Sequence, residues 1–186
     1  MRSDEPDMAV TPAIEERIDR IARKVRERDL RLGPTLSDDS IENFESRCNF
    51  TLPKGYRAFL QHIGDGGMGP PGHGLLRLGQ FPADMNDKES RPWANFRQVS
   101  RPFPFTQSYV WEEGATSAEG TKDQVGDGSI HLGTDDCAQY WLLIVTGAER
   151  GNVWMLTDVG ITPTAPKRDF LQWFEDWLDG ARQWWT

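Results

Sequence analysis

Three histidines, His62, His73 and His131, are the side chains of this sequence best suited to bind a metal or transfer a proton. No HxH or HxxxH spacing joins any two of them, so a metal site would require the fold to gather distant residues. Asp135 and Asp136 follow His131 closely and offer oxygen ligands or a general base. A hydrolytic or metal-dependent site at His131, Asp135 and Asp136 is therefore the catalytic candidate. The alternative is a strand histidine followed by a polar hairpin.

The remaining reactive groups are in settings that favour structural roles. No serine or cysteine occupies a GxSxG-type nucleophile turn. The glycine-rich segment 64–74, GDGGMGPPGHG, follows a predicted helix and lacks the Gly-Lys-Ser/Thr of a phosphate-binding loop, which indicates a helix-terminating turn. Cys48 and Cys137 have no CxxC partner, so we expect two reduced thiols, no disulfide framework and no cysteine-rich metal site.

The charge distribution bears on the class of partner. The chain carries 21 basic and 29 acidic side chains, a net charge of −8. Residues 1–31 hold eight of each sign, so the whole excess of negative charge lies in residues 32–186. Such a body repels phosphate backbones and anionic lipid and attracts basic surfaces. We therefore expect neither direct nucleic-acid binding nor membrane association.

Length and hydropathy predict one soluble domain. A chain of 186 residues is long enough to bury a sizeable core without disulfide bonds or a structural metal. The longest apolar run, residues 140–145, is far shorter than the roughly 20 residues that span a bilayer, and the first ten residues hold no apolar signal core. We expect a cytoplasmic protein.

Three helices are predicted over residues 12–64. The first, within 11–29, repeats isoleucine or valine every three or four residues, and its other faces are densely charged. It could dock on a partner, but a solvated helix lying on the domain is the favoured interpretation. The second opens at N-cap candidates in 37–40 and ends near Asn49, and the third starts at Pro53 and ends at Gly64.

The middle of the chain predicts strands and irregular segments. Residues 75–81, LLRLGQF, are short, apolar and strand-like. Scattered prolines and aromatics over 81–128 indicate irregular structure, with short helices near 92–98 and an exposed acidic loop at 112–128. An antiparallel meander follows, with strands at 129–132, 140–145 and 151–157.

A long aromatic helix is predicted over 166–185. Trp173 and Trp177 share its apolar side and are assigned to the core, which argues against sugar stacking by exposed rings. Trp184 and Trp185 lie at its end, where an interface contact is plausible. Helices at both ends and a mostly antiparallel sheet between them give an α+β fold.

Two stretches together resemble the SUKH superfamily (SMI/KNR family). Residues 37–67 carry the IxxFE pattern and then LPKGYRAFLQHIGDGG, and residues 128–179 carry a strand meander with GNVW and an aromatic closing helix. The resemblance implies a single domain over 37–186, preceded by a helix and linker over 1–36 that packs on the domain or extends it. These motif residues act as scaffold, and a scaffold alone does not specify a function.

The resemblance also implies a binding function. Many bacterial members of the superfamily are immunity proteins that neutralise a cognate polymorphic toxin, often a nuclease, whereas yeast relatives are regulatory interaction proteins. No matched position is catalytic, so the expectation is a non-enzymatic inhibitor of a basic toxin, without cofactor or metal. A regulatory interaction module of the same fold is the alternative, and the hydrolase described above is the third hypothesis.

A partner is expected to contact loops rather than the scaffold. Acidic loop residues would supply charge, and two tryptophans would supply aromatic anchors. The candidates are Asp65, Asp84, Asp87, Glu89, Trp93, Trp111, Glu112, Glu113, Glu119, Asp123, Asp127, Asp135 and Asp136.

Overall fold

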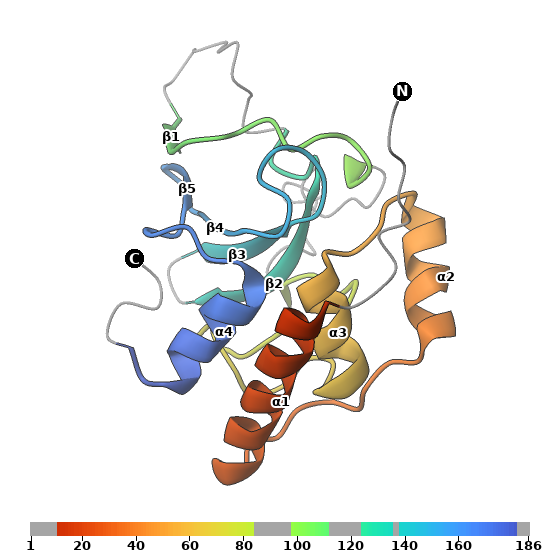
Figure 1. Cartoon of the computed structure of the whole chain (residues 1–186). Helices are drawn as coiled ribbons and strands as arrows, with labels where there is room; N and C mark the ends of the chain where they lie inside the picture. The colour runs from red at the N-terminus through yellow and green to blue at the C-terminus, as the bar shows by residue number, and fades with distance from the viewer. Residues whose placement is uncertain (1–10, 84–97, 112–123, 136–137, 182–186) are drawn as a thin grey trace.

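The computed structural model describes residues 11–83, 98–111, 124–135 and 138–181 (Figure 1). Its strands form one antiparallel sheet in the order β1-β5-β4-β3-β2, which confirms the predicted α+β class. The helices are α1 (Pro12–Glu27), α2 (Asp38–Cys48), α3 (Lys54–His62) and α4 (Phe170–Leu178). The strands are β1 (Tyr109–Val110), β2 (Ser129–Asp135), β3 (Gln139–Ile144), β4 (Val153–Leu156) and β5 (Gly160–Pro163).

Local sequence signals account for the three predicted helices, all of which are present. Pro12 occupies the first turn of α1, where its missing N–H costs nothing. The Ser37 hydroxyl accepts a hydrogen bond from the Ser40 N–H at 3.3 Å and caps α2. Asn49, in the left-handed conformation, ends α2. Pro53 precedes the first residue of α3.

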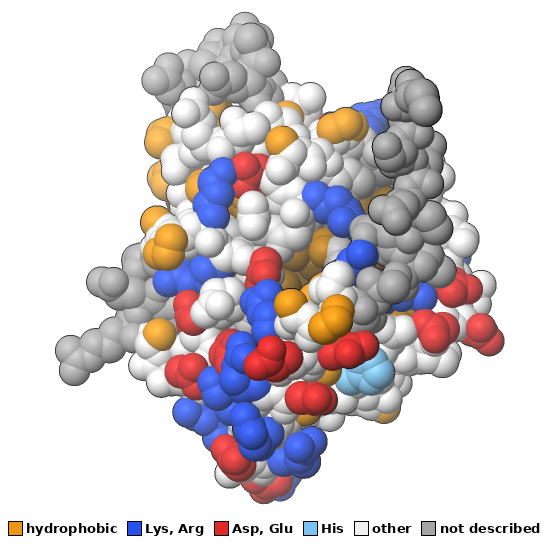
Figure 2. Space-filling view, viewed as in Figure 1, with side chains coloured by type: hydrophobic (Ala, Val, Ile, Leu, Met, Phe, Trp, Pro, Cys, Tyr) orange, Lys and Arg blue, Asp and Glu red, His pale blue; other side chains and the backbone are white. Residues whose placement is uncertain are grey.

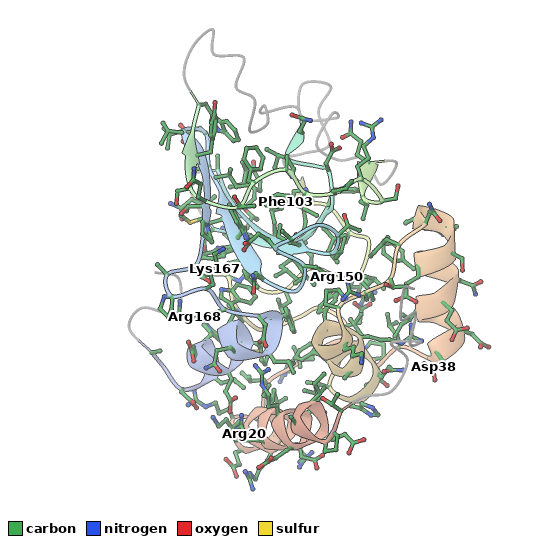
Figure 3. All side chains as sticks on the ribbon, turned by 45° about the horizontal axis from the view of Figure 1, so that its top comes forward. Arg20, Asp38, Phe103, Arg150, Lys167 and Arg168 are labelled. Atoms are coloured by element: carbon green, nitrogen blue, oxygen red, sulfur yellow. The ribbon has the colours of Figure 1, made fainter. Side chains whose placement is uncertain are left out.

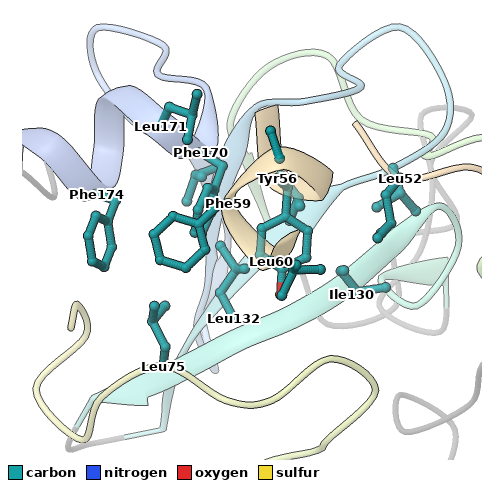
Figure 4. Packing of buried hydrophobic residues seen from close by; sticks show 14 of the residues in the cluster. Leu52, Tyr56, Phe59, Leu60, Leu75, Ile130, Leu132, Phe170, Leu171 and Phe174 are labelled. Carbon is teal, nitrogen blue, oxygen red and sulfur yellow. The ribbon is translucent and has the colours of Figure 1, made fainter. Parts of the chain in front are cut away.

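Each face of the sheet carries its own hydrophobic cluster. On one face, α3 and α4 pack against β2, β3 and β4 in the main core, and α1 packs on α3 and α4. Figure 4 shows the centre of this core, where Phe59 of α3 meets Phe170 and Phe174 of α4 edge-on at 4.9 and 4.8 Å between ring centroids. On the opposite face, Phe103 and Phe105 cover the sheet in place of a helix. Side chains along β3 and β4 alternate between the two faces, so both strands contribute residues to both clusters.

The meander has two strands more than the sequence predicts. β5 follows β4 through a tight turn, and β1 adds to its outer edge with Tyr109 opposite Ile161 and Val110 opposite Gly160. A Cβ at Gly160 would lie 2.3 Å from the Tyr109 carbonyl oxygen, so only glycine allows this close approach.

Some predictions about irregular segments are wrong. Residues 75–81 form no strand: Leu75 makes an isolated bridge with Gly67, and the Leu76 N–H donates to the Leu132 carbonyl of β2 at 2.8 Å. Residues 125–128 are buried beside the sheet rather than part of an exposed acidic loop. The closing helix is shorter than predicted and begins after its N-cap, Asp169.

Other predictions lie outside the described residues. They are the short helices near 92–98 apart from residue 98, the acidic loop over 112–123, Cys137, and the end of the closing helix with Trp184 and Trp185. Within the described part of the chain, no helix is long and apolar enough to cross a membrane.

Candidate partner-binding surface

Asp65, a predicted contact residue, is buried within the turn that follows α3. Its side chain accepts a hydrogen bond from the Leu78 N–H at 2.7 Å, and burial raises the pKa of its carboxyl group. The neighbouring Gly67 bridges both Leu32 and Leu75. Asp65 therefore holds the glycine-rich segment together.

Asp135 joins the same glycine-rich segment to the sheet. One carboxylate oxygen accepts from the Gly72 N–H at 2.5 Å and the other from the Trp141 indole at 2.8 Å. Asp127 is also buried, 3.8 Å from the Arg101 guanidinium, and burial raises the pKa of its carboxyl group. Asp135 therefore acts within the fold, whereas Asp127 is buried beside Arg101 without a hydrogen bond to its Oδ1 from any described residue.

Trp111 is half-buried beside β1. Its ring packs on Phe105 and Tyr109, and its indole donates to the Thr157 carbonyl at 3.3 Å. β1 is at the opposite edge of the sheet from β2, whose two ends carry Asp127 and Asp135. The four described candidates therefore do not form one surface. The other nine, Asp84, Asp87, Glu89, Trp93, Glu112, Glu113, Glu119, Asp123 and Asp136, lie outside the described residues.

The catalytic candidate His131 lies in an aromatic environment. It is buried on β2 with ring centroids 5.5 Å from Phe81 and 6.3 Å from Tyr140. Both oxygens of Asp135 accept hydrogen bonds, as described above, and Asp136 is outside the described residues. In the ranges that the structure describes, no three His, Cys, Asp or Glu side chains gather as metal ligands would.

The basic side chains of α1 that face α4 are neutralised by it. Arg17 forms a two-pronged ion pair with Asp169, both contacts being 2.7 Å. Arg20 pairs with both oxygens of Glu175 at 2.6 and 2.8 Å, and Lys24 bonds the same carboxylate at 2.8 Å. We call these contacts the α1–α4 ion network, which Figure 3 locates by its label on Arg20.

Glu175 is the centre of the network and is nearly inaccessible to solvent. Only 6% of its side chain is exposed. The hydrogen bond from Arg20, supported by Lys24, lowers the pKa of its carboxyl group to about 2. Lys24 also reaches Asp179 at 2.7 Å. The network and the buried Ile18 and Ile21 fasten α1 to the domain.

Two acidic side chains of α1, Glu15 and Asp19, lie on another side of the helix, toward α3. Here α1 and α3 enclose a groove of about 500 Å³, which we call the α1–α3 groove. In Figure 2, acidic side chains lie on this lower part of the surface beside a histidine, whereas blue side chains gather nearer α4. The lining residues are Glu15, Ile18, Asp19, Ala22, Arg26, Ala58 and His62.

Helix α2 presents a second group of acids. Asp38, Asp39 and Glu42 are exposed. Arg57 of α3 forms ion pairs with three of the carboxylates of α2. The distances are 3.0 Å to Asp38, 3.4 Å to Glu42 and 2.7 Å to the buried Glu45. Four carboxylates and one guanidinium leave this group negative, and it lies on the right of the molecule in Figure 2.

A larger groove, of about 730 Å³, separates α2 from the turn at 145–150. Two charged residues that line it, Glu45 and Arg150, already form hydrogen bonds within the fold. Glu45 accepts from the Leu52 N–H and from Arg57, and Arg150 donates to the carbonyls of Thr51 and Leu52. This groove therefore has less free charge than the α1–α3 groove.

The sequence analysis missed the exposed acids of α1 and α2, although the periodicity of α1 could have found those of α1. Arg17, Arg20 and Lys24 recur at helical spacing on one side, and Glu15 and Asp19 are one turn apart on another. Residues 1–31 hold equal numbers of basic and acidic side chains, so their net charge does not reveal this separation.

Comparison with known proteins was informative at the level of the family. Residues 35–180 match the model of the SMI1 / KNR4 family (SUKH-1). The match includes α2, α3, α4 and all five strands, and it begins after α1. No curated protein and no solved structure matches the chain.

Proposed function

Because the chain belongs to the SMI1 / KNR4 family (SUKH-1), which is of the immunity-protein type, we propose that it binds and neutralises a cognate bacterial toxin. Inhibition is by stoichiometric protein–protein binding and involves no catalytic step. The family signature itself is scaffold, so the support for a particular partner must come from the surface.

The observation that carries the proposal is the acidic surface formed by α1 and α2. Glu15 and Asp19 on α1, and Asp38, Asp39 and Glu42 on α2, are exposed on either side of α3. Three cations of α1, Arg17, Arg20 and Lys24, are held by α4 and its N-cap, whereas Arg23 and Arg26 are exposed on the same helix. The surface therefore fits a basic partner.

A nuclease is the toxin class that this charge suits best. An enzyme that grips phosphates presents a basic cleft, and an acidic protein that covers the cleft gains steering as well as affinity. A specific interface of about 1,600 Å² draws some 20 to 30 residues from each partner, more than these five acids supply. The nine candidates outside the described residues remain proposed contributors.

The contacts of His131 and Asp135 favour binding over catalysis at β2. A general base must reach the substrate, whereas both oxygens of Asp135 bind groups within the fold and His131 is buried beside Phe81 and Tyr140. Metal analysis of the purified protein tests the hydrolase hypothesis directly, since a stoichiometric metal would favour it.

Affinity capture from the native lysate tests the proposed function. We expect one near-stoichiometric protein that is toxic when expressed alone and harmless when this chain is co-expressed. Recovery of only non-toxic partners would refute the immunity function and favour the regulatory module. An empty capture would likewise count against it and direct attention to a substrate screen.

Charge reversal on α2 provides a second test with the captured protein. The double variant Asp39→Lys/Glu42→Lys is expected to slow association about tenfold at low salt, because rim charges act mainly on the association rate. Asp158→Lys, in the exposed turn after β4, is the control. If the α2 variant and the control slow association equally, the effect comes from net charge alone, and α2 is removed from the proposed interface.

A further inference from the structure

The α1–α3 groove runs along α1 for about three helical turns. Its α1 wall comprises positions 15, 18, 19, 22 and 26, which share one face of the helix. These positions extend over about 17 Å, or three helical turns. Ala22 and Ala58 keep the floor low, so a third helix can approach both walls at ordinary packing distance.

The charges of the groove specify the occupant. Within the described residues, no ion pair engages Glu15 or Asp19, whereas Arg17, Arg20 and Lys24 are all paired with α4. The two free acids lie one turn apart near the start of α1 and can each meet a cation on a facing helix.

Arg26 marks the other end of the groove and gives it polarity. It lines the wall three turns from Glu15. An occupying helix therefore meets acids at one end and a cation at the other, with the half-buried Ala22 between them, next to Ile18 and Ala58, which the fold already buries. Such a groove accepts an amphipathic helix by the helix-in-groove mode of recognition.

We propose that the toxin inserts an amphipathic helix with basic residues into the α1–α3 groove, an inference that rests on the proposed function. One wall of the groove, α1, precedes the residues that match the family. The partner is therefore recognised by one helix outside the family match, α1, together with one helix inside it, α3.

A designed peptide tests the groove without knowledge of the toxin. The probe is a monomeric 14-residue helix of leucine and lysine with an apolar stripe, and its counterpart carries glutamate in place of lysine. We expect the lysine peptide to bind and to shift the amide resonances of Ala22, Ala58 and His62 in the labelled protein. Shifts that map instead to α2 or to the sheet would overturn the proposal.

Two groove variants and a matched control define the result. Glu15→Lys/Asp19→Lys reverses the free acids, and Ala22→Leu fills the floor without changing charge while retaining helix propensity. Each variant is expected to weaken binding of the lysine peptide at least tenfold. Glu16→Lys/Glu27→Lys makes the same charge change on exposed positions of α1 that do not line the groove, and it should weaken binding less than twofold. If both double variants weaken peptide binding equally, binding at the groove is refuted.

The captured toxin then separates failure of this inference from failure of the proposed function. Both groove variants should protect cells at least tenfold less well than the control variant at the same expression level. Full protection by both would overturn the groove and leave the immunity function standing. Peptide binding at the groove without any toxin in the capture would reject the immunity function and retain the groove as a docking site for a basic helix.

Discussion

Replacing Glu175 by glutamine should remove most of the stability contributed by the α1–α4 ion network. The folded structure lowers the pKa of this carboxyl group from 4.5 to about 2. Each pKa unit corresponds to about 1.4 kcal/mol, so the ionised carboxylate contributes about 3 kcal/mol to folding near neutral pH. Arg20 is 37% exposed and regains water when its partner is lost, so we expect Glu175→Gln to cost about 2 to 3 kcal/mol at pH 7.

The loss should depend on pH in a defined direction. The folded protein protonates Glu175 only near pH 2, whereas the unfolded chain protonates it near pH 4.5. The stabilisation is therefore complete above pH 4.5 and disappears as the pH falls toward 2.

Urea unfolding at a series of pH values measures the difference. The free energies of unfolding of the parent and Glu175→Gln should differ by about 2 to 3 kcal/mol at pH 7 and converge below pH 3. Asp179→Asn is the control, because a carboxylate that is 52% exposed and shares Lys24 should contribute less than about 1 kcal/mol. A difference below about 0.5 kcal/mol, or one that stays constant with pH, would refute the reasoning.

Three further substitutions test the packing around the candidate surfaces. Ile21→Ala should cost about 2 to 5 kcal/mol in urea unfolding because Ile21 is fully buried, and a cost below about 1 kcal/mol would show that α1 is loosely attached. Asp135→Ala leaves the Gly72 N–H and the Trp141 indole without their acceptor, so the melting temperature should fall by several degrees; an unchanged value would return Asp135 to the interface candidates. Gly67→Ala should yield little folded protein by circular dichroism, because its φ is +112° and a Cβ would lie 2.6 Å from a backbone oxygen. Normal yield and stability would show that the turn relaxes easily.

The sequence predicted those elements whose signals are local. The spacing of Ile14, Ile18 and Ile21, the cap at Ser37 and Pro53 before α3 each act within one or two helical turns, and the structure confirms the three helices. β1 and β5 give no such signal. A strand of two residues has no alternation to detect, and β5 contains both a glycine and a proline, which are typical of turns.

The candidate site was harder to predict because exposure is a property of the whole fold. Asp65 and Asp135 are polar residues in glycine-rich surroundings, and their types indicate exposed loops. In the structure they accept hydrogen bonds from backbone amides that would otherwise lack partners. Long-range packing decides between these two outcomes, and no local pattern encodes it.

The α1–α4 ion network also determines when α1 becomes fully attached to the rest of the fold. Its ion pairs join residues about 150 positions apart in the chain. At a synthesis rate of 5 to 20 residues per second, α1 leaves the ribosome roughly 8 to 30 s before α4 is complete. Through that interval Ile21 has no α4 to pack against and the cations of α1 have no acceptors there. Until its last described helix has been translated, a nascent chain therefore holds α1 without the ion pairs that join it to α4.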